Sequence, residues 1–207
     1  MGQRLHIHPD NPQQRLLQIA VDALRLGQLV VYPTDTTYAL AWHLGDKNAL
    51  DRVVNLRGLS KNHQFTLACR DLSELGSYAR VDNSAFRLLK SLTPGPYTFI
   101  LPASREVPRR LQNPRRKTIG LRVPDHPIAR ALLESLGEPL MSSTLLLPGD
   151  ELPLTDSREM LERLSSQVDL VIDGGYCGLE PTTVLDLTGE TPSVLRPGRG
   201  DVSMLSL

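Results

Sequence analysis

The sequence lacks any long apolar run, and this excludes a helical membrane protein. A membrane-spanning helix needs roughly 20 consecutive apolar residues, and no run in the 207 residues approaches that length. Residues 1–15 are polar and hold no apolar signal region, so we expect a protein that is not secreted. Cysteine is scarce too: Cys69 and Cys177 lie far apart, which excludes a disulfide scaffold and a Cys-x-x-Cys zinc site. We therefore expect a cytoplasmic protein with no membrane partner and no metal site of its own.

The chain has no net charge, because 23 basic residues balance 23 acidic ones, but the two signs are segregated. Six cations and one anion lie between Arg105 and Lys117, whereas ten carboxylates and two arginines lie between Asp150 and Glu190. A polarity of this kind lets one face attract a polyanion while the molecule stays neutral. Charge alone leaves a second interpretation open, namely a solvated surface on which the cations cluster by chance.

Helical and strand-like patterns alternate along the chain without a repeat or a linker, which predicts one α/β domain over residues 1–207. Apolar spacing and capping residues predict helices at about 12–26, from 46, from 82, at 127–136 and near 157–164. Short apolar runs predict strands at 29–32, 65–69, 97–101, 118–123, 139–142, 168–172, 183–187 and 193–195. The turn 188–191 would join the last two strands in a hairpin, so the sheet should be mixed rather than wholly parallel.

Polar side chains cluster where the predicted strands and helices end, although the sequence lacks a Gly-x-Gly-x-x-Gly motif, a phosphate loop and a Gly-x-Ser-x-Gly elbow. Ligands tend to bind at the strand ends of an open sheet. The clusters lie at 32–38, 57–61, 93–98, 122–127, 142–144, 180–183 and 196–200. In the second cluster, the two cations Arg57 and Lys61, together with Gly58, can form an anion-binding loop. Each cluster taken alone also fits an ordinary polar turn.

Taken in order, these clusters resemble motifs of the YrdC/YciO family of threonylcarbamoyl-adenylate synthases. Tyr32-Pro-Thr-Asp-Thr-Thr-Tyr38 resembles the family's Pro-Thr-[Glu/Asp]-Thr-x-Tyr motif, and Thr93-Pro-Gly-Pro-Tyr-Thr98 is similar to its Pro-Gly-Pro-x-Thr turn. The later clusters resemble its Arg-x-Pro-x-x-Pro stretch, its Pro-Ser-Thr-Val-x-Asp strand and its closing Arg-x-Gly at 121–127, 181–186 and 196–198. Each motif is weak, but the ordered set covers about residues 12–200, which the resemblance makes the core of the domain.

The resemblance implies a fold, a reaction and a set of ligands. The implied fold is a twisted open mixed sheet flanked by helices, similar to that of dihydroxybutanone-phosphate synthase, with a large positively charged cleft. The implied reaction takes ATP with Mg²⁺, bicarbonate and L-threonine and yields threonylcarbamoyl-AMP and pyrophosphate. Partner proteins then transfer the threonylcarbamoyl group to tRNA, and members of the family also bind double-stranded RNA.

The resemblance also assigns roles to individual residues. It makes Arg57, Lys61 and Thr36 catalytic, with the two cations on the phosphates and Thr36 beside Tyr38 on threonine. The residues implied to bind substrate or nucleotide are Thr34, Tyr38, Asn55, Thr98, Arg122, Ser142, Thr144, Thr182, Thr183 and Arg196. The cations expected to bind RNA are Arg109, Arg110, Arg115, Arg116 and Lys117.

Two positions depart from the synthase motifs. The family's Lys-x-Arg aligns with 55–57 and its Ser-x-Asn with 144–146, so Asn55 stands in place of a lysine and Leu146 in place of an asparagine. A charged hydrogen bond is worth about 1.5–3 kcal/mol and a neutral one roughly 0.5–1.5 kcal/mol, so both changes should weaken ATP binding or turnover. These departures resemble the YciO branch of the family.

Three functions therefore remain open at the level of the sequence. The first is a threonylcarbamoyl-AMP synthase, slowed by the two departures. The second is a non-catalytic protein that binds tRNA or double-stranded RNA, with an affinity that falls steeply with salt. The third is a related nucleotidyl- or acyl-transfer enzyme whose less polar pocket around Leu146 takes a different substrate.

Overall fold

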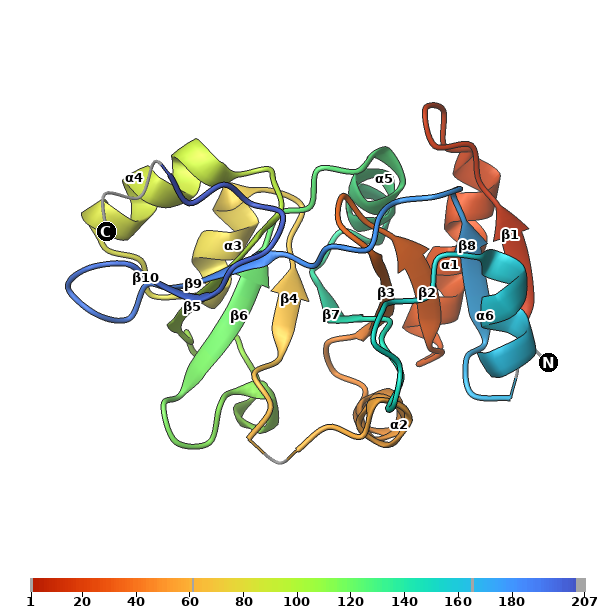
Figure 1. The fold of residues 1–207 in the computed structure, drawn as a ribbon, viewed down its shortest axis with the longest axis horizontal. Helices are drawn as coiled ribbons and strands as arrows, with labels where there is room; N and C mark the ends of the chain where they lie inside the picture. The colour runs from red at the N-terminus through yellow and green to blue at the C-terminus, as the bar shows by residue number, and fades with distance from the viewer. Residues whose placement is uncertain (1, 61, 165, 204–207) are drawn as a thin grey trace.

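A single twisted mixed sheet of ten strands runs through the molecule (Figure 1). The computed structural model describes residues 2–60, 62–164 and 166–203. The strand order across the sheet is β1-β8-β2-β3-β7-β4-β6-β5-β9-β10. The strands are β1 (Gln3–His6), β2 (Val30–Pro33), β3 (Tyr38–His43), β4 (Thr66–Ala68), β5 (Tyr97–Pro102), β6 (Thr118–Arg122), β7 (Leu140–Thr144), β8 (Leu170–Asp173), β9 (Thr183–Asp186) and β10 (Ser193–Arg196).

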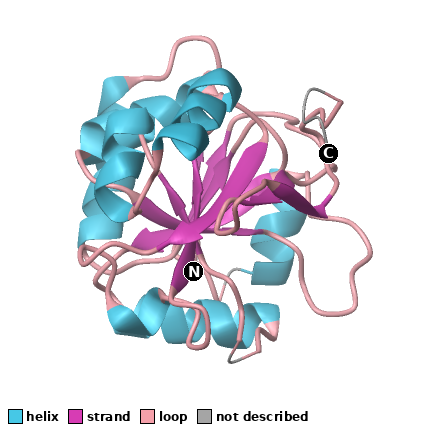
Figure 2. Ribbon diagram, turned by 90° about the vertical axis from the view of Figure 1, so that its left-hand side faces the viewer, coloured by secondary structure: helices cyan, strands magenta, loops and turns pink. Residues whose placement is uncertain are grey.

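Helices lie on both faces of this sheet (Figures 1 and 2). The α-helices are α1 (Gln14–Arg25), α2 (Lys47–Arg57), α3 (Leu72–Tyr78), α4 (Asn83–Leu92), α5 (Pro127–Leu136) and α6 (Ser157–Leu164). The predicted starts of α2 and α4 are confirmed, because the Asp46 and Asp82 carboxylates accept hydrogen bonds from the first-turn amides of Ala49 and Ala85. Gly137 ends α5 in the left-handed conformation, as predicted.

Strand pairing is mixed, as the sequence predicts. Parallel pairs join β8 to β1 and β2, β4 to β6, and β5 to β9, whereas the remaining neighbours pair antiparallel. The predicted hairpin of β9 and β10 is present, with Ser193 opposite Asp186. The fold is therefore the expected α/β architecture with a twisted mixed sheet between helices.

The two faces of the central strands differ in polarity, and this difference creates the hollow described below. Facing residues in register point to the same side of a sheet. One such row is apolar and fully buried under α2, α3 and α4: Met141, Leu67, Leu121 and Phe99. The adjacent row, on the opposite face, is small or polar in part: Ser142, Thr66, Gly120 and Ile100. On that face, α1 and α5 cover β2 and β3, and the strands beyond them line a pocket instead.

Two strands, one α-helix and a 3-10 helix at Arg109–Leu111 were not predicted from the sequence. The run that forms β3 is continuously apolar and follows a polar turn directly, so neither alternation nor a separating loop marks it as a hairpin partner of β2. β1 is short and mostly exposed, and α3 is a single short helix capped by Asp71. The predicted start of α1 was one or two residues early, because Gln13 occupies its N-cap position.

Within the described ranges, no helix combines the length and apolarity that crossing a membrane requires.

We predict that Gly198→Ala destabilises the fold by about 1–3 kcal/mol, because overpacking forces the backbone to move. A Cβ atom at Gly198 would lie 2.4 Å from the carbonyl oxygen of Pro181 and 2.6 Å from that of Thr182. Gly76→Ala in α3 is the matched control, since its added Cβ meets nothing within 4 Å, and it should stabilise by roughly 0.5–1 kcal/mol. Urea unfolding of both variants checks this, and equal midpoints would contradict it.

Candidate functional site

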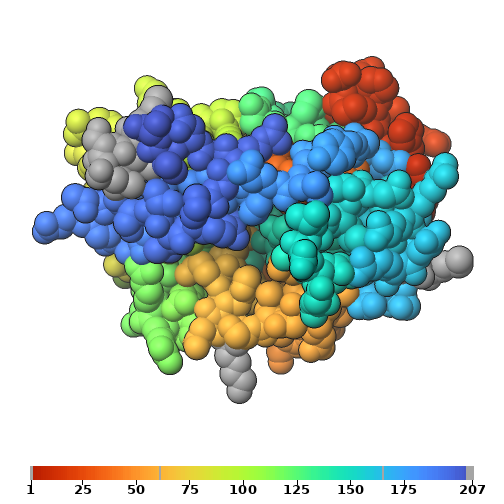
Figure 3. All heavy atoms as spheres, in the orientation of Figure 1, coloured from red at the N-terminus to blue at the C-terminus, as the bar shows by residue number. Residues whose placement is uncertain are grey.

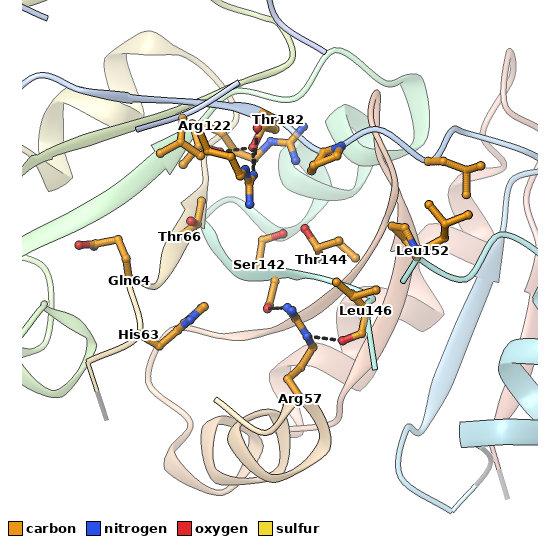
Figure 4. A pocket seen from close by; sticks show the side chains of 18 of the residues that line it. Arg57, His63, Gln64, Thr66, Arg122, Ser142, Thr144, Leu146, Leu152 and Thr182 are labelled. Atoms are coloured by element: carbon orange, nitrogen blue, oxygen red, sulfur yellow. Dashed lines mark hydrogen bonds between the residues drawn. The ribbon is translucent and has the colours of Figure 1, made fainter. Parts of the chain in front are cut away.

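A pocket of about 430 Å³ opens where several distant segments of the chain meet. The surface is hollowed between the orange segment before β4, the teal segment after β7 and the blue C-terminal segment (Figure 3). The residues predicted from the sequence that line it are Arg57, Thr98, Arg122, Ser142, Thr144, Thr182 and Arg196. Three guanidinium groups and four hydroxyl groups from α2, β5, β6, β7, β10 and the segment before β9 therefore share one cavity (Figure 4).

Arg57 enters the pocket from the C-terminal end of α2, where Gly58 turns the chain in the left-handed conformation (φ 59°). Its Nε donates to the Leu146 carbonyl oxygen at 2.6 Å and its Nη1 to Ser143 Oγ at 2.6 Å (Figure 4). Burial lowers the pKa of Arg57, and the positive charge of Arg196 lowers it further. Neither arginine forms a salt bridge with a described carboxylate, so this corner of the pocket carries uncompensated positive charge.

Arg122 lies at the end of β6 and pairs with Asp35 in the turn between β2 and β3. Both side chains are buried, with 7% and 10% of their surface exposed. The pair uses Arg122 Nη2 and Asp35 Oδ1, while Arg122 Nε and Asp35 Oδ2 are buried without a hydrogen-bond partner among the described residues. Because buried polar atoms are costly unless bonded, these two atoms leave unused hydrogen-bonding capacity next to the pocket wall that Arg122 lines.

Hydroxyl groups complete the polar wall. Tyr32 Oη and Ser142 Oγ form a buried hydrogen bond of 2.8 Å, and Thr98 Oγ1 and Thr182 Oγ1 form another of 2.8 Å. Arg196 donates through Nη2 to the Thr182 carbonyl oxygen at 2.9 Å, and burial lowers the pKa of Arg196. These bonds fix the hydroxyl positions before any ligand arrives, which reduces the entropy that binding costs.

Other predicted residues do not reach the pocket wall. The Thr34, Thr36 and Tyr38 side chains are buried inside the turn that carries Asp35: Thr34 Oγ1 donates to the Thr37 carbonyl oxygen at 2.7 Å, and Tyr38 Oη donates to that of Gly175 at 2.7 Å. Thr183 Oγ1 is also buried and donates to the Gly200 carbonyl oxygen at 2.7 Å. These hydroxyls thus support the turns around the pocket rather than line it.

The predicted site residues also include Asn55 and Lys61. Asn55 is exposed on α2 and is not part of the lining. Lys61 lies outside the described residues.

The cationic segment 105–117 lines much of a second concavity of about 850 Å³. Arg109, Arg116 and Lys117 line it, together with two cations that the sequence did not mark for RNA, Arg80 and Arg105. Arg116 is partly neutralised, since it donates to Asp186 at 2.7 Å.

The remaining two predicted RNA-binding cations lie outside this lining. Arg110 donates to the Gly45 carbonyl oxygen at 2.5 Å, so it is engaged at another place on the surface. Arg115 is exposed next to the concavity. The two concavities lie close together, because Ile100 lines the first and Pro102, two residues later on the same face of β5, lines the second.

Sequence reasoning missed the other half of the lining. His63 and Gln64 approach the pocket from the connection between α2 and β4, just beyond the cluster at 57–61, and Thr66 approaches it from the start of β4. The available signal for them is their position immediately before, or at the start of, the predicted strand 65–69. Leu152 and Leu179, which are 58% and 38% exposed, were not predicted either; they form an apolar rim with Leu146, which the sequence already placed at the pocket. Among the described residues, no group of His, Cys, Asp or Glu is arranged to hold a metal ion.

The protein resembles proteins of known family. The family profile described as "Telomere recombination" (Sua5_yciO_yrdC) matches residues 22–198. "Uncharacterized protein YciO" of Escherichia coli is 58% identical over 202 residues, which are 98% of each chain. The crystal structure of E. coli YciO has a TM-score of 0.96 at 57% identity and covers 99% of this chain and 100% of that one.

A second relative has a named activity. A threonylcarbamoyl-AMP synthase of Pyrococcus abyssi is 32% identical over 185 residues, which are 88% of this chain and 54% of that protein. The crystal structure of P. abyssi Sua5 complexed with L-threonine has a TM-score of 0.86 at 29% identity and covers 95% of this chain and 57% of that one. This chain therefore spans only about half of the length of that synthase.

We predict that Asp35→Asn lowers the free energy of unfolding by about 3–5 kcal/mol, because it leaves the buried Arg122 charge unpaired. The double variant Asp35→Leu with Arg122→Met should recover most of that loss, since it removes both charges. Asp125→Asn is the control: its contact with Arg130 is exposed and 3.7 Å long, so its effect should stay below about 0.5 kcal/mol. Urea denaturation measures all three, and an Asp35→Asn protein as stable as the wild type would refute the prediction.

Proposed function

Because the chain belongs to the Sua5/YciO/YrdC family, we propose that its pocket performs threonylcarbamoyl-adenylate chemistry on ATP, bicarbonate and L-threonine. The observation that carries this proposal is the convergence of Arg57, Arg122 and Arg196 with a set of hydrogen-bonded hydroxyls in one cavity. The reaction displaces pyrophosphate from the α-phosphorus of ATP. Catalysis of such a step consists mainly of positioning the reactants and stabilising negative charge.

Arg57 and Arg196 are the proposed phosphate ligands. Their positive charges lie close enough for Arg196 to lower the pKa of Arg57, and a phosphate between them would relieve that repulsion. An arginine can hold a phosphate through two parallel N–H donors. The Mg²⁺ ion would arrive with the nucleotide, since no described group of carboxylates and histidines is arranged to hold it.

The corner formed by Arg122 and Asp35 is the proposed site of the amino acid. Arg122 lines the pocket, and its Nε and the Oδ2 of Asp35 behind the lining are buried without a hydrogen-bond partner among the described residues. An α-amino acid offers the complementary pair, a carboxylate and an ammonium group. The complex of P. abyssi Sua5 with L-threonine supports this assignment at the level of the family.

Of the two residues that depart from the synthase motifs, one lies outside the pocket lining and the other is part of it. Asn55 is exposed away from the lining, whereas the Leu146 side chain is part of the pocket and its carbonyl oxygen holds Arg57. The loss of an amide at position 146 removes a polar contact from the phosphate end of the cavity. We therefore propose a synthase of low turnover.

The direct test is pyrophosphate release from ATP in the presence of both L-threonine and bicarbonate. Arg57→Ala should weaken ATP–Mg²⁺ binding by roughly 10- to 150-fold, the equivalent of one charged hydrogen bond. Calorimetric titration measures that affinity. Lys47→Ala, which removes an exposed cation on the same helix, should leave the affinity unchanged. Unaltered nucleotide affinity in Arg57→Ala would show that the phosphates bind elsewhere.

A second function, binding of tRNA or double-stranded RNA, is favoured by one observation. Arg80 and Arg105 join Arg109 and Lys117 around the second concavity, and none of these four side chains forms a salt bridge with a described carboxylate. We propose that phosphates of an RNA backbone lie there. Such contacts release counterions, so affinity should fall steeply as salt rises.

The double variant Arg109→Ala with Lys117→Ala should reduce the slope of log affinity against log salt by about 2, one unit for each lost phosphate contact. Arg15→Ala, which removes an exposed cation from α1, is the control and should leave the slope unaltered. Filter binding of a double-stranded RNA across a salt series measures both. An unchanged slope in the double variant would exclude this concavity as the RNA site.

A further inference from the structure

His63 is a pocket residue for which the family motifs quoted above provide no role. It lies in the connection between α2 and β4 and is half-buried in the pocket wall. Its ring meets Phe65 edge to face, with centroids 5.1 Å apart, and Phe65 meets Trp42 edge to face at 6.4 Å. The imidazole points into the cavity, toward the space between Arg57 and Ser142 (Figure 4). Its ring nitrogens form no hydrogen bond to a described residue, so a nitrogen is free for a ligand.

The surroundings keep this ring neutral near pH 7. Burial lowers the pKa of His63, and the guanidinium of Arg57 lowers it further. The other charged groups on the pocket are Arg196 at the phosphate end, Glu151 at the exposed rim, and the Arg122–Asp35 pair, whose charges cancel. A neutral imidazole is a proton acceptor.

Other described groups of the lining are poorer bases. Serine and threonine hydroxyls hold their protons near neutral pH. Glu151 is exposed at the rim, and Asp35, behind the lining, is bound to Arg122. Among the described lining residues, His63 is thus the half-buried, unprotonated and unpaired nitrogen base of this cavity.

We propose that His63 is the general base, and then the general acid, of the step that joins bicarbonate to the amino group of the amino acid; this inference rests on the proposed function. The ammonium group first loses one proton to solvent; the amine nitrogen then forms a bond to the bicarbonate carbon, and a second proton passes from it to a ring nitrogen of His63. The imidazolium returns that proton to the hydroxyl of the adduct, and the carbon–oxygen bond breaks to release water. The balance is R–NH₂ + HCO₃⁻ → R–NH–CO₂⁻ + H₂O, so His63 ends unchanged and the carbamate can attack ATP.

The position of Arg57 fits both halves of this step. Two of its nitrogens are held by Leu146 and Ser143, and its Nη2 has no bond to a described residue and is available to bicarbonate. An anion bound there lies beside His63. The positive charge of Arg57 also makes the imidazolium a stronger acid, which speeds return of the proton to the leaving hydroxyl.

The test compares His63→Gln with the wild type. Turnover of threonine- and bicarbonate-dependent pyrophosphate release should fall about 10²- to 10⁴-fold, the usual contribution of general acid–base catalysis. The affinity for ATP–Mg²⁺ should stay within about twofold, because the phosphate ligands are untouched. His8→Gln makes the same substitution at an exposed position and should leave turnover unchanged.

The pH profile separates a proton-transfer role from a structural one. With the HCO₃⁻ concentration held constant and the rates normalised to the free-amine fraction of threonine, the wild-type rate should fall on the acid side below pH 6.5, because burial and Arg57 lower the pKa of His63 and protonation removes the base. His63→Gln should lack this acid limb. In Arg57→Gln, NMR titration should show the pKa of His63 moving up, since one of its two causes is removed. His63→Asn serves as the second variant if His63→Gln fails to fold.

The outcomes are distinct. If the wild type binds neither ATP nor threonine and releases no pyrophosphate, the proposed function fails. If the wild type is active and His63→Gln keeps its rate and its acid limb, the function stands and the role of His63 is refuted. If His63→Gln loses ATP affinity in parallel with turnover, His63 is a nucleotide ligand and the proposal is likewise overturned.

Discussion

The ion pair between Arg122 and Asp35 is the interaction on which the pocket depends. Arg122 ends β6, and Asp35 lies in the turn before β3, yet β7 and β4 separate these strands in the sheet. Three strand spacings amount to about 14 Å in a flat sheet, which is more than the two side chains can bridge. The turn that carries Asp35 must therefore reach across the ends of β7 and β4 for the pair to form, and residues of those two strands, Ser142 and Thr66, line the cavity.

A buried charge pair of this kind is a weak source of stability, because desolvation offsets most of the attraction. Its value here is geometric. The pair fixes the turn that carries Asp35, and the buried hydroxyls of Thr34 and Thr36 hold the same turn from the inside. Arg122 is thereby held in the pocket wall, with its Nε and the Asp35 Oδ2 buried behind the surface. A core made only of apolar contacts would close this hollow instead of shaping it.

Much of the fold was accessible from the sequence, because local signals decide it. Carboxylates at Asp46 and Asp82 mark helix starts, and the turn at 188–191 marks the β9–β10 hairpin. β3 was not predicted because it is buried on both faces, so its sequence does not alternate between polar and apolar residues. It also follows a polar turn directly, and nothing in the sequence marks where the turn ends and the strand begins. Its pairing with β2 and β7 is a property of the whole sheet, which no local pattern encodes.

The site was predictable to a smaller extent. The order of the motifs brought Arg57, Arg122 and Arg196 together correctly, because strand ends of one sheet converge. The direction of a hydroxyl is decided by the hydrogen bonds of its turn, so the sequence could not reveal that Thr36 and Tyr38 point inward. His63 escaped notice because its importance comes from Phe65 and Arg57 lying beside it, which is a fact of packing and not of spacing.

The connection from β8 to β9 has a consequence for how the molecule assembles. It carries the chain from the second strand of the sheet to the ninth, so the walls that hold Thr182 and Arg196 are supplied late in chain order. Any portion of the polypeptide that stops before Thr182 has the helices and most of the sheet but only part of the cavity. Ligand recognition is thereby linked to completion of the chain, and contacts between such distant segments favour slow folding.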